Sequence, residues 1–144
     1  MPGTPETILA FDFGKRRIGV AVGQQITDSA SPLGVVRNGE NGPDQDHIQR
    51  LIREWSPARL VVGMPLHADG TPSAITELVG LFIQELAKFG LPIDTVDERY
   101  TSVEAQQMLR SRRAEGGRGR IRKETIDSTA ALLIAERWLK NAQR

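Results

Sequence analysis

Three strand-like segments come first in this chain, and only after them do helix-like and strand-like segments alternate. Ile8–Phe13 is a short apolar run that is interrupted by Asp12 and closed by Gly14, and the β-branched segment Ile18–Val22 follows a basic turn. Two such runs separated by a tight glycine-containing turn are expected to pair as an antiparallel hairpin. Leu33–Arg37 is predicted as a third strand. The opening of the chain therefore favours antiparallel pairing.

The remainder of the chain has the periodicity of helices separated by short buried strands. Apolar residues recur at helical spacing from Ile48 to Trp55 and again from Ile75 to Leu86. Leu60–Val62 and Ile93–Val96 are typical of buried strands. Successive strand–helix–strand units require parallel pairing with right-handed crossovers. A capping box at Thr101–Glu104 predicts a third helix, and a last helix is expected from about residue 124 to near the C-terminus.

These elements together predict one α/β domain over residues 8–142. Its sheet would be mixed and five-stranded, with helices on both faces. Residues 1–7 are expected to be a short disordered lead-in, because they contain neither a basic head nor an apolar run and so do not form a signal peptide.

Composition excludes several classes of protein. The chain is 39% hydrophobic and 26% charged, as expected of a soluble globular domain. No stretch approaches the roughly 18 apolar residues that a spanning helix needs, so no membrane association is expected. Cysteine is absent, which excludes disulfides, thiolate zinc sites and cysteine nucleophiles. A reducing compartment fits this composition, and we expect a cytoplasmic protein.

Three carboxylates are the candidate functional residues. Asp12 ends the first strand and Glu98 follows the last one, and ligands gather at the carboxyl ends of parallel strands. Asp127 stands at the start of the apolar stripe of the last helix. Each acid alone has an ordinary explanation, as an exposed strand end or as a first-turn acid that complements the helix dipole. Together they predict a site for a hard cation, Mg²⁺ or Mn²⁺. Pairs of such ions, about 3.5–4 Å apart, assist phosphodiester cleavage.

Basic residues are concentrated in one segment. Between Arg110 and Lys123 there are seven basic residues against one acid, which leaves 12 basic and 17 acidic residues for the rest of the chain. Such asymmetry suggests a local site for a polyanion. A solvated helix end followed by a glycine-rich loop is the alternative explanation.

Several motifs, in order and at sensible spacing, resemble the YqgF/RuvX family. The resemblance extends from about Ile8 to Leu139, and its motifs are Asp12–Ala21, Gly63–Leu66 with Asp69–Gly70, Asp97–Ser102 and Ile126–Ala131. It implies a ribonuclease H-like three-layer fold similar to that of the RuvC resolvases. It also implies a Mg²⁺-dependent endonuclease, regarded either as a Holliday junction resolvase or as a nuclease that matures the 5′ end of pre-16S rRNA.

Carried over by motif, the family's acidic site falls on Asp12, Glu98 and Asp127. No second acid stands within one turn after Asp127, so the choice between one and two metal ions stays open. Candidates for phosphate contact are the basic residues near the motifs and in the glycine-rich segment, namely Lys15, Arg16, Arg17, Arg99, Arg113, Arg118, Arg120 and Lys123. Lys15–Arg17 could equally be a solvated turn. For Arg99 a structural pairing with an acid is slightly favoured.

The expected partners are structured RNA (pre-16S rRNA or ribosomal particles) or branched DNA. A non-catalytic module that binds RNA, or a protein partner in ribosome assembly or transcription, is a second hypothesis. A nucleotide-dependent phosphotransferase is disfavoured, because enzymes of that kind enclose the nucleotide between two domains. Cutting a junction symmetrically would need a dimer, and the sequence leaves the choice between a monomer and a weak homodimer open.

Overall fold

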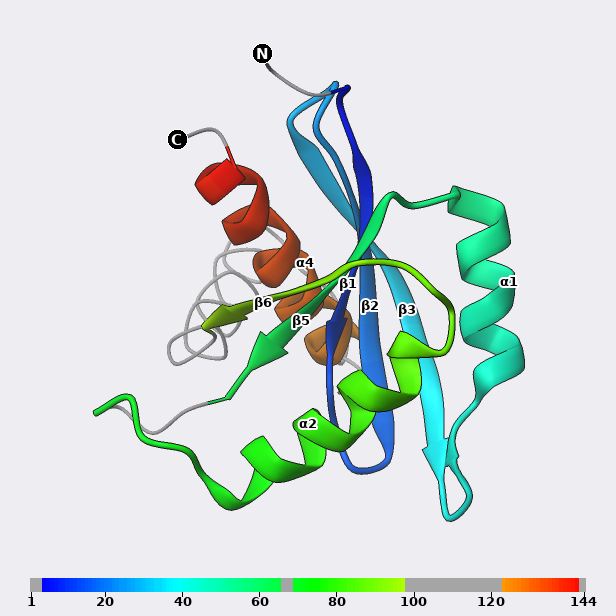
Figure 1. Ribbon diagram of the computed structural model, residues 1–144, viewed down its shortest axis with the longest axis vertical. Coiled ribbons are helices and arrows are strands. Elements are labelled where there is room, and N and C mark those ends of the chain that lie inside the picture. The colour runs from blue at the N-terminus through cyan, green and yellow to red at the C-terminus, as the bar shows by residue number, and fades with distance from the viewer. Residues whose placement is uncertain (1–3, 66–68, 98–122, 143–144) are drawn as a thin grey trace, which may run out of the picture.

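The computed structural model describes residues 4–65, 69–97 and 123–142, the side chains of 123–127 excepted. Three helices and six strands are found in this part of the chain (Figure 1). They are β1 (Thr7–Asp12), β2 (Arg17–Gln24), β3 (Ser29–Gly39), β4 (Gly42–Pro43), α1 (Gln45–Trp55), β5 (Arg59–Met64), α2 (Ala74–Ala87), β6 (Ile93–Asp97) and α4 (Lys123–Ala142). The predicted helix that opens at Thr101–Glu104 lies outside the described residues.

The strands form one mixed sheet in the order β4-β3-β2-β1-β5-β6. β1 pairs antiparallel with β2 and parallel with β5, and β5 pairs parallel with β6. The predicted mixture of an antiparallel opening and parallel later strands is therefore confirmed. The predicted number of five strands is wrong, because β4 adds a two-residue sixth strand. Gly42, with a φ of 97°, lets the chain reverse sharply enough for Gly42 and Pro43 to pair with the end of β3.

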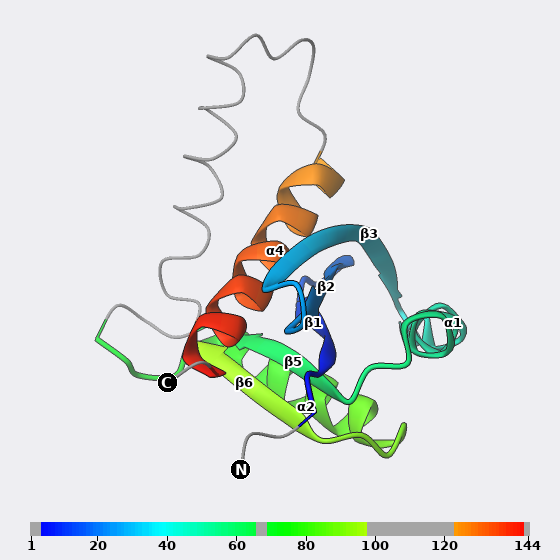
Figure 2. The same ribbon diagram turned by 90° about the horizontal axis from the view of Figure 1, so that it is seen from above.

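Successive side chains along each strand point to opposite faces of the sheet, so the core has two layers. Leu9 and Phe11 of β1 belong to the cluster beneath α1 and α2, whereas Ile8 and Ala10 belong to the cluster beneath α4. Figure 2 shows α4 on one side of the sheet and α1 and α2 on the other. The prediction of helices on both faces is confirmed. No helix in the described ranges is long and apolar enough to cross a membrane.

The folded domain begins earlier than the sequence predicts. β1 starts at Thr7, and the backbone N–H of Glu6 donates to Gln25 Oε1 at 2.7 Å. In return, the N–H of Gln25 donates to the carbonyl of Glu6 at 2.9 Å. Glu6 and Thr7 are therefore part of the domain rather than of a disordered lead-in. Their partners lie far along the chain, so no local pattern marks them.

The start of α2 is tied to the end of β5. The hydroxyl of Thr76 donates to the carbonyl of Pro65 at 2.6 Å, and the N–H of Ser73 donates to the hydroxyl oxygen of Thr76 at 2.8 Å. These bonds satisfy polar groups that a helix N-terminus otherwise leaves without partners. They also hold the residue after β5 at the carboxyl edge of the sheet.

The turn between β1 and β2 is clamped by β3. The side-chain amide of Asn38 donates to the carbonyl of Gly14 at 2.8 Å, and the N–H of Asn38 donates to the carbonyl of Arg16 at 2.9 Å. The turn is also tight, because a Cβ added to Gly14 would lie 2.3 Å from the carbonyl oxygen of Arg17. Glycine is needed at this position for space.

We expect Gly14→Ala to destabilise the protein by about 1–3 kcal/mol, because the new methyl group would meet backbone that cannot move without breaking the turn. The measurement is urea-induced unfolding followed by circular dichroism. Gly39→Ala is the matched control: a Cβ there meets nothing within 4 Å, and we expect a change of less than about 0.5 kcal/mol. Equal stability of the two variants would contradict the role given to Gly14.

Candidate active site

The carboxyl ends of β1, β5 and β6 lie along one edge of the sheet. Phe11 of β1 pairs with Val62 of β5, and Met64 of β5 pairs with Asp97 of β6, so the three parallel strands end in near register. Asp12 is the last residue of β1 and is half-buried. Because side chains alternate along a strand, Asp12 is on the same side as Ile8 and Ala10, the side covered by α4.

Small residues in the contact help helix α4 to pack closely on this side of the sheet. Ala131 and Ala135 of the helix are fully buried against a layer that includes Ala10 and Ala21. In Figure 1 the helix runs behind the sheet from its orange start, toward the β1–β2 turn, to its red end. Asp127 lies in the second turn of α4, whose backbone is described, whereas its side chain lies outside the described residues.

Only part of the predicted acidic trio can therefore be located. Asp12 is at the carboxyl edge, as expected, and β6 ends at Asp97, the residue before Glu98. Glu98 itself lies outside the described residues. Within the described ranges there is no group of three or more aspartate, glutamate, histidine or cysteine residues arranged to hold a metal ion. The convergence of the three acids therefore stays a prediction.

Arg137 of α4 is a feature that the sequence did not reveal. Its guanidinium Nη1 donates to the backbone carbonyl of Asp97 at 2.6 Å, across 40 residues of chain. The bond joins α4 to the final residue of β6. Arg137 thereby holds the strand end from which the chain continues into Glu98. Arg137 stands one residue before the buried Trp138, and this position in the helix does not predict the contact with Asp97.

Only some of the predicted phosphate-contacting residues can be located. Lys15 and Arg16 are exposed and Arg17 is half-buried, all at the β1–β2 turn beside the end of β1. Lys123 is the first residue of α4, with its side chain outside the described residues. The remaining four, Arg99, Arg113, Arg118 and Arg120, also lie outside the described residues.

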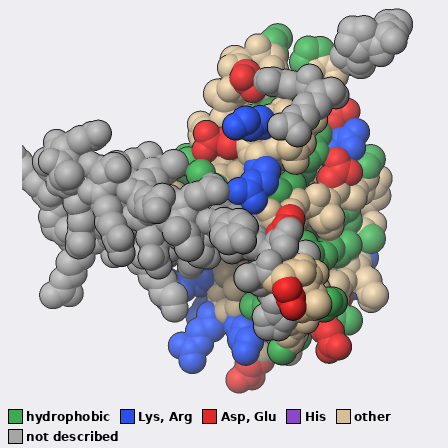
Figure 3. All heavy atoms as spheres, turned by 90° about the vertical axis from the view of Figure 1, so that its left-hand side faces the viewer, with side chains coloured by type: hydrophobic (Ala, Val, Ile, Leu, Met, Phe, Trp, Pro, Cys, Tyr) green, Lys and Arg blue, Asp and Glu red, His purple; other side chains and the backbone are tan. Residues whose placement is uncertain are grey.

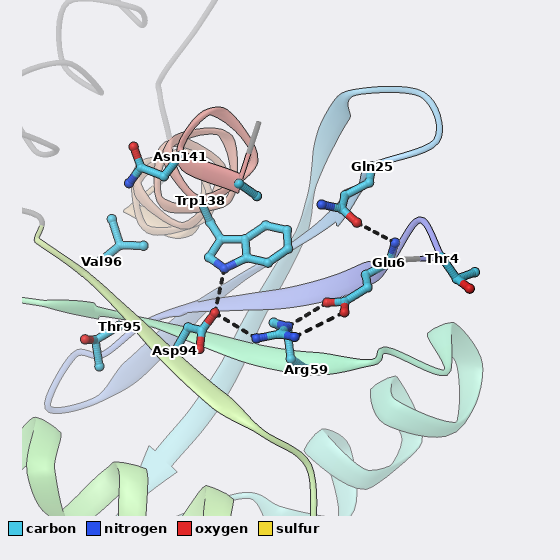
Figure 4. A pocket seen from close by; sticks show the side chains of 10 residues that line it. Thr4, Glu6, Gln25, Arg59, Asp94, Thr95, Val96, Trp138 and Asn141 are labelled. Atoms are coloured by element: carbon cyan, nitrogen blue, oxygen red, sulfur yellow. Dashed lines mark hydrogen bonds and ion pairs between the residues drawn. The ribbon is translucent and has the colours of Figure 1, made fainter. Parts of the chain in front are cut away.

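A pocket of about 660 Å³ lies at the opposite end of the sheet, near the start of β1 (Figure 4). Its centre is Arg59, which donates from Nε and Nη2 to the two carboxylate oxygens of Glu6 at 2.6 and 3.1 Å. Arg59 Nη1 and Trp138 Nε1 both donate to Asp94 Oδ2, at 3.0 and 2.8 Å. The pKa of the Arg59 guanidinium is raised, mainly by its hydrogen bonds to Glu6. Burial acts in the opposite direction and lowers the pKa.

This network has a structural role. It joins the segment before β1 to β5, β6 and α4, and each of the donors just named is used within the protein. The carboxyl edge, where Asp12 ends β1 and β6 leads into Glu98, is the better candidate for chemistry, because ligands gather at the carboxyl ends of parallel strands.

The model of one protein family matches residues 6–141, nearly the whole chain, and its description is "RuvX: Holliday junction resolvase". The chain belongs to the RuvX family. The resemblance predicted from its motifs is thereby confirmed.

Curated relatives support the same membership. The chain is 44% identical over 136 residues to a protein of Azotobacter vinelandii, covering 94% of each chain. It is 41% identical over 143 residues to a protein of Nitrosococcus oceani, covering 99% of this chain and 91% of the other. Both relatives carry the name "Putative pre-16S rRNA nuclease". This RuvX protein is therefore similar along its whole length to proteins of that name.

Solved structures establish the type of fold. RuvC of Thermus thermophilus, in complex with Holliday junction substrate, superimposes with a TM-score of 0.55 at 16% identity and 95% coverage of both chains. A second structure of Thermus thermophilus RuvC gives a TM-score of 0.52 at 14% identity. The predicted ribonuclease H-like fold is confirmed for this RuvX protein.

The network around Arg59 makes a prediction about stability. We expect Trp138→Phe to lower the free energy of unfolding by about 1 kcal/mol more than Trp55→Phe does. Trp138 loses its hydrogen bond to Asp94, whereas Trp55, half-buried on α1, makes no hydrogen bond within the described part of the chain. Urea unfolding of both variants measures the difference. Equal losses would mean that the Trp138–Asp94 bond adds nothing to stability.

Proposed function

We propose that this protein is a metal-dependent nuclease that processes the 5′ end of pre-16S rRNA. Family membership supports phosphodiester hydrolysis, and the names of relatives at 41–44% identity support the RNA substrate. The structural observation that carries the proposal is the position of Asp12, half-buried at the carboxyl edge on the side covered by α4. Action on ribosomal precursors is consistent with a cytoplasmic protein.

In the proposed site Asp12, Glu98 and Asp127 are the metal ligands. β6 leads directly into Glu98, and α4 carries Asp127 near its start. A donor set of carboxylate oxygens suits Mg²⁺ or Mn²⁺ better than zinc. Such an ion would stabilise charge on the phosphate and lower the pKa of a bound water. Asp12 needs a rigid support for this role, and β1, hydrogen-bonded to β2 and β5, provides it.

Arg137 has a positioning role in this proposal. Its bond to the carbonyl of Asp97 fixes the end of β6 against α4, so the strand that leads into Glu98 is joined directly to the helix that carries Asp127. Arg137 contacts neither substrate nor metal in this account. It acts through the strand end that it holds.

Cleavage of four-way DNA junctions is the second candidate function. The family description and the RuvC fold favour it. A resolvase would need two sites related by a two-fold axis in order to make symmetric cuts. A monomer or a weak homodimer could instead process RNA, with or without a protein partner from ribosome assembly or transcription.

We expect Asp12→Asn to lower metal-dependent cleavage by at least about 100-fold, because the loss of one charged ligand weakens the stabilisation of the transition state by several kcal/mol. The assay is cleavage of a labelled pre-16S rRNA leader in Mg²⁺ or Mn²⁺, with EDTA as the metal-free reference. Asp46→Asn is the matched control, because Asp46 is exposed on α1, on the opposite side of the sheet. It should retain full activity.

A four-way DNA junction assayed in parallel decides between the two substrates. RNA cleavage that Asp12→Asn abolishes supports the proposal, whereas junction cleavage alone supports the resolvase. Undiminished metal-dependent cleavage by folded Asp12→Asn would exclude Asp12 as a catalytic ligand. Failure of the wild type to cut either substrate, with the fold intact and RNA bound, would favour a binding module.

A further inference from the structure

Charges are distributed unevenly along the edge of the sheet that holds Asp12. The strand order places the end of β3, the start of β2, the end of β1 and the ends of β5 and β6 along this edge. In that order the charged residues are Arg37, Arg17, Asp12 and Asp97. The β2–β3 side of Asp12 is therefore basic. Asp97 lies on the other face of the sheet, because it pairs with Met64 and follows Val96, which belongs to the cluster beneath α4.

Arg17 and Arg37 occupy directly opposed positions on adjacent strands. Ile18 and Val36, the next pair along, face α1 and α2. By alternation Arg17 and Arg37 lie on the other side, which is also the side of Asp12. Directly opposed residues have Cβ atoms about 4.5–5.5 Å apart, and like charges there are unfavourable. The pair therefore concentrates positive charge at the ends of β2 and β3.

The backbone around these residues is held firmly. The carbonyl of Arg37 accepts a hydrogen bond from the N–H of Asp44 at 2.9 Å. The next residue, Asn38, clamps the turn that carries Lys15 and Arg16. Lys15, Arg16 and Arg37 are exposed, and none of them forms an ion pair with another residue of the described ranges. Their charges are thus displayed on a fixed scaffold rather than on a flexible loop.

The surface view supports a shared basic area. In Figure 3 several Lys and Arg side chains lie together at the lower end of the face shown, with acidic side chains beside them, and Figure 1 places the β1–β2 turn at this end. We define the basic rim as Lys15, Arg16, Arg17 and Arg37.

We propose that the basic rim binds the phosphate backbone of RNA on one side of Asp12, and that Arg37 is its anchor on β3. The RNA strand crosses the ends of β2 and β3 and reaches Asp12 from that side. Charges on two adjacent strands can contact neighbouring phosphates. This inference rests on the proposed nuclease function, and it adds a binding residue and a direction for the substrate.

The test is binding of a fluorescein-labelled pre-16S rRNA leader in EDTA, so that no cleavage occurs, measured by fluorescence anisotropy over a series of salt concentrations. We expect Arg37→Ala to raise Kd about 3- to 10-fold and to reduce the slope of log Kd against log salt by about one. Arg37→Lys should recover most of the affinity, because a phosphate contact needs the positive charge. Arg37→Glu should weaken binding further than Arg37→Ala.

Arg50→Ala is the matched control, because Arg50 is exposed on α1, on the far side of the sheet. Its Kd and salt slope should equal those of the wild type. If Arg37→Ala also matches the wild type while its unfolding midpoint is unchanged, the basic rim does not include Arg37 and the inference is overturned. Wild-type protein that neither binds nor cleaves the RNA would instead overturn the proposed function, so the two failures are distinguishable.

Discussion

The close packing of α4 on the small side chains in the middle of the sheet is the contact on which the other features depend. Ala10 and Ala21 on the strands, and Ala131 and Ala135 on the helix, are the small buried side chains of this contact. The helix therefore approaches β1 closely enough for its second turn, which carries Asp127, to share a side of the sheet with Asp12. Larger residues in this layer would push the helix outward, because a packed interior accommodates added volume only through strain.

Much of the fold follows from patterns of apolar residues that can be found in the sequence. The stripes of α1 and α2 and the apolar runs of β1, β2, β5 and β6 predict their elements, because each of these buries a continuous face. The parts of the sheet that the sequence missed, the first residues of β3 and the whole of β4, are held by backbone pairing instead. β3 extends back to Ser29 through residues with little apolar character, and β4 is only Gly42 and Pro43. Their hydrogen bonds depend on neighbours in space, which one-dimensional periodicity does not reveal.

In the candidate site, too, residues whose role depends on their sequence neighbours were predictable, and residues whose role depends on distant parts of the chain were not. Asp12 is recognisable in the sequence because burying a carboxylate within an apolar strand costs free energy unless the carboxylate is paired or binds a metal. Arg37 is not, since its significance arises from Arg17, which stands 20 positions earlier and is brought opposite by the register of β2 and β3. The bond from Arg137 to the carbonyl of Asp97 is equally hidden, because it involves a backbone atom of a distant strand. Family motifs supply Glu98 and Asp127, whose side chains lie outside the described residues.

The arrangement around the pocket at Arg59 also determines how the domain can be connected to other molecules. Thr4 and Ala142, close to the two limits of the described chain, both line this pocket. Asp12 lies at the other end of β1, so Thr4 and Ala142 are at the opposite end of the domain from the carboxyl edge. A fusion partner joined to the domain at Thr4 or at Ala142 would therefore be attached at the end away from Asp12.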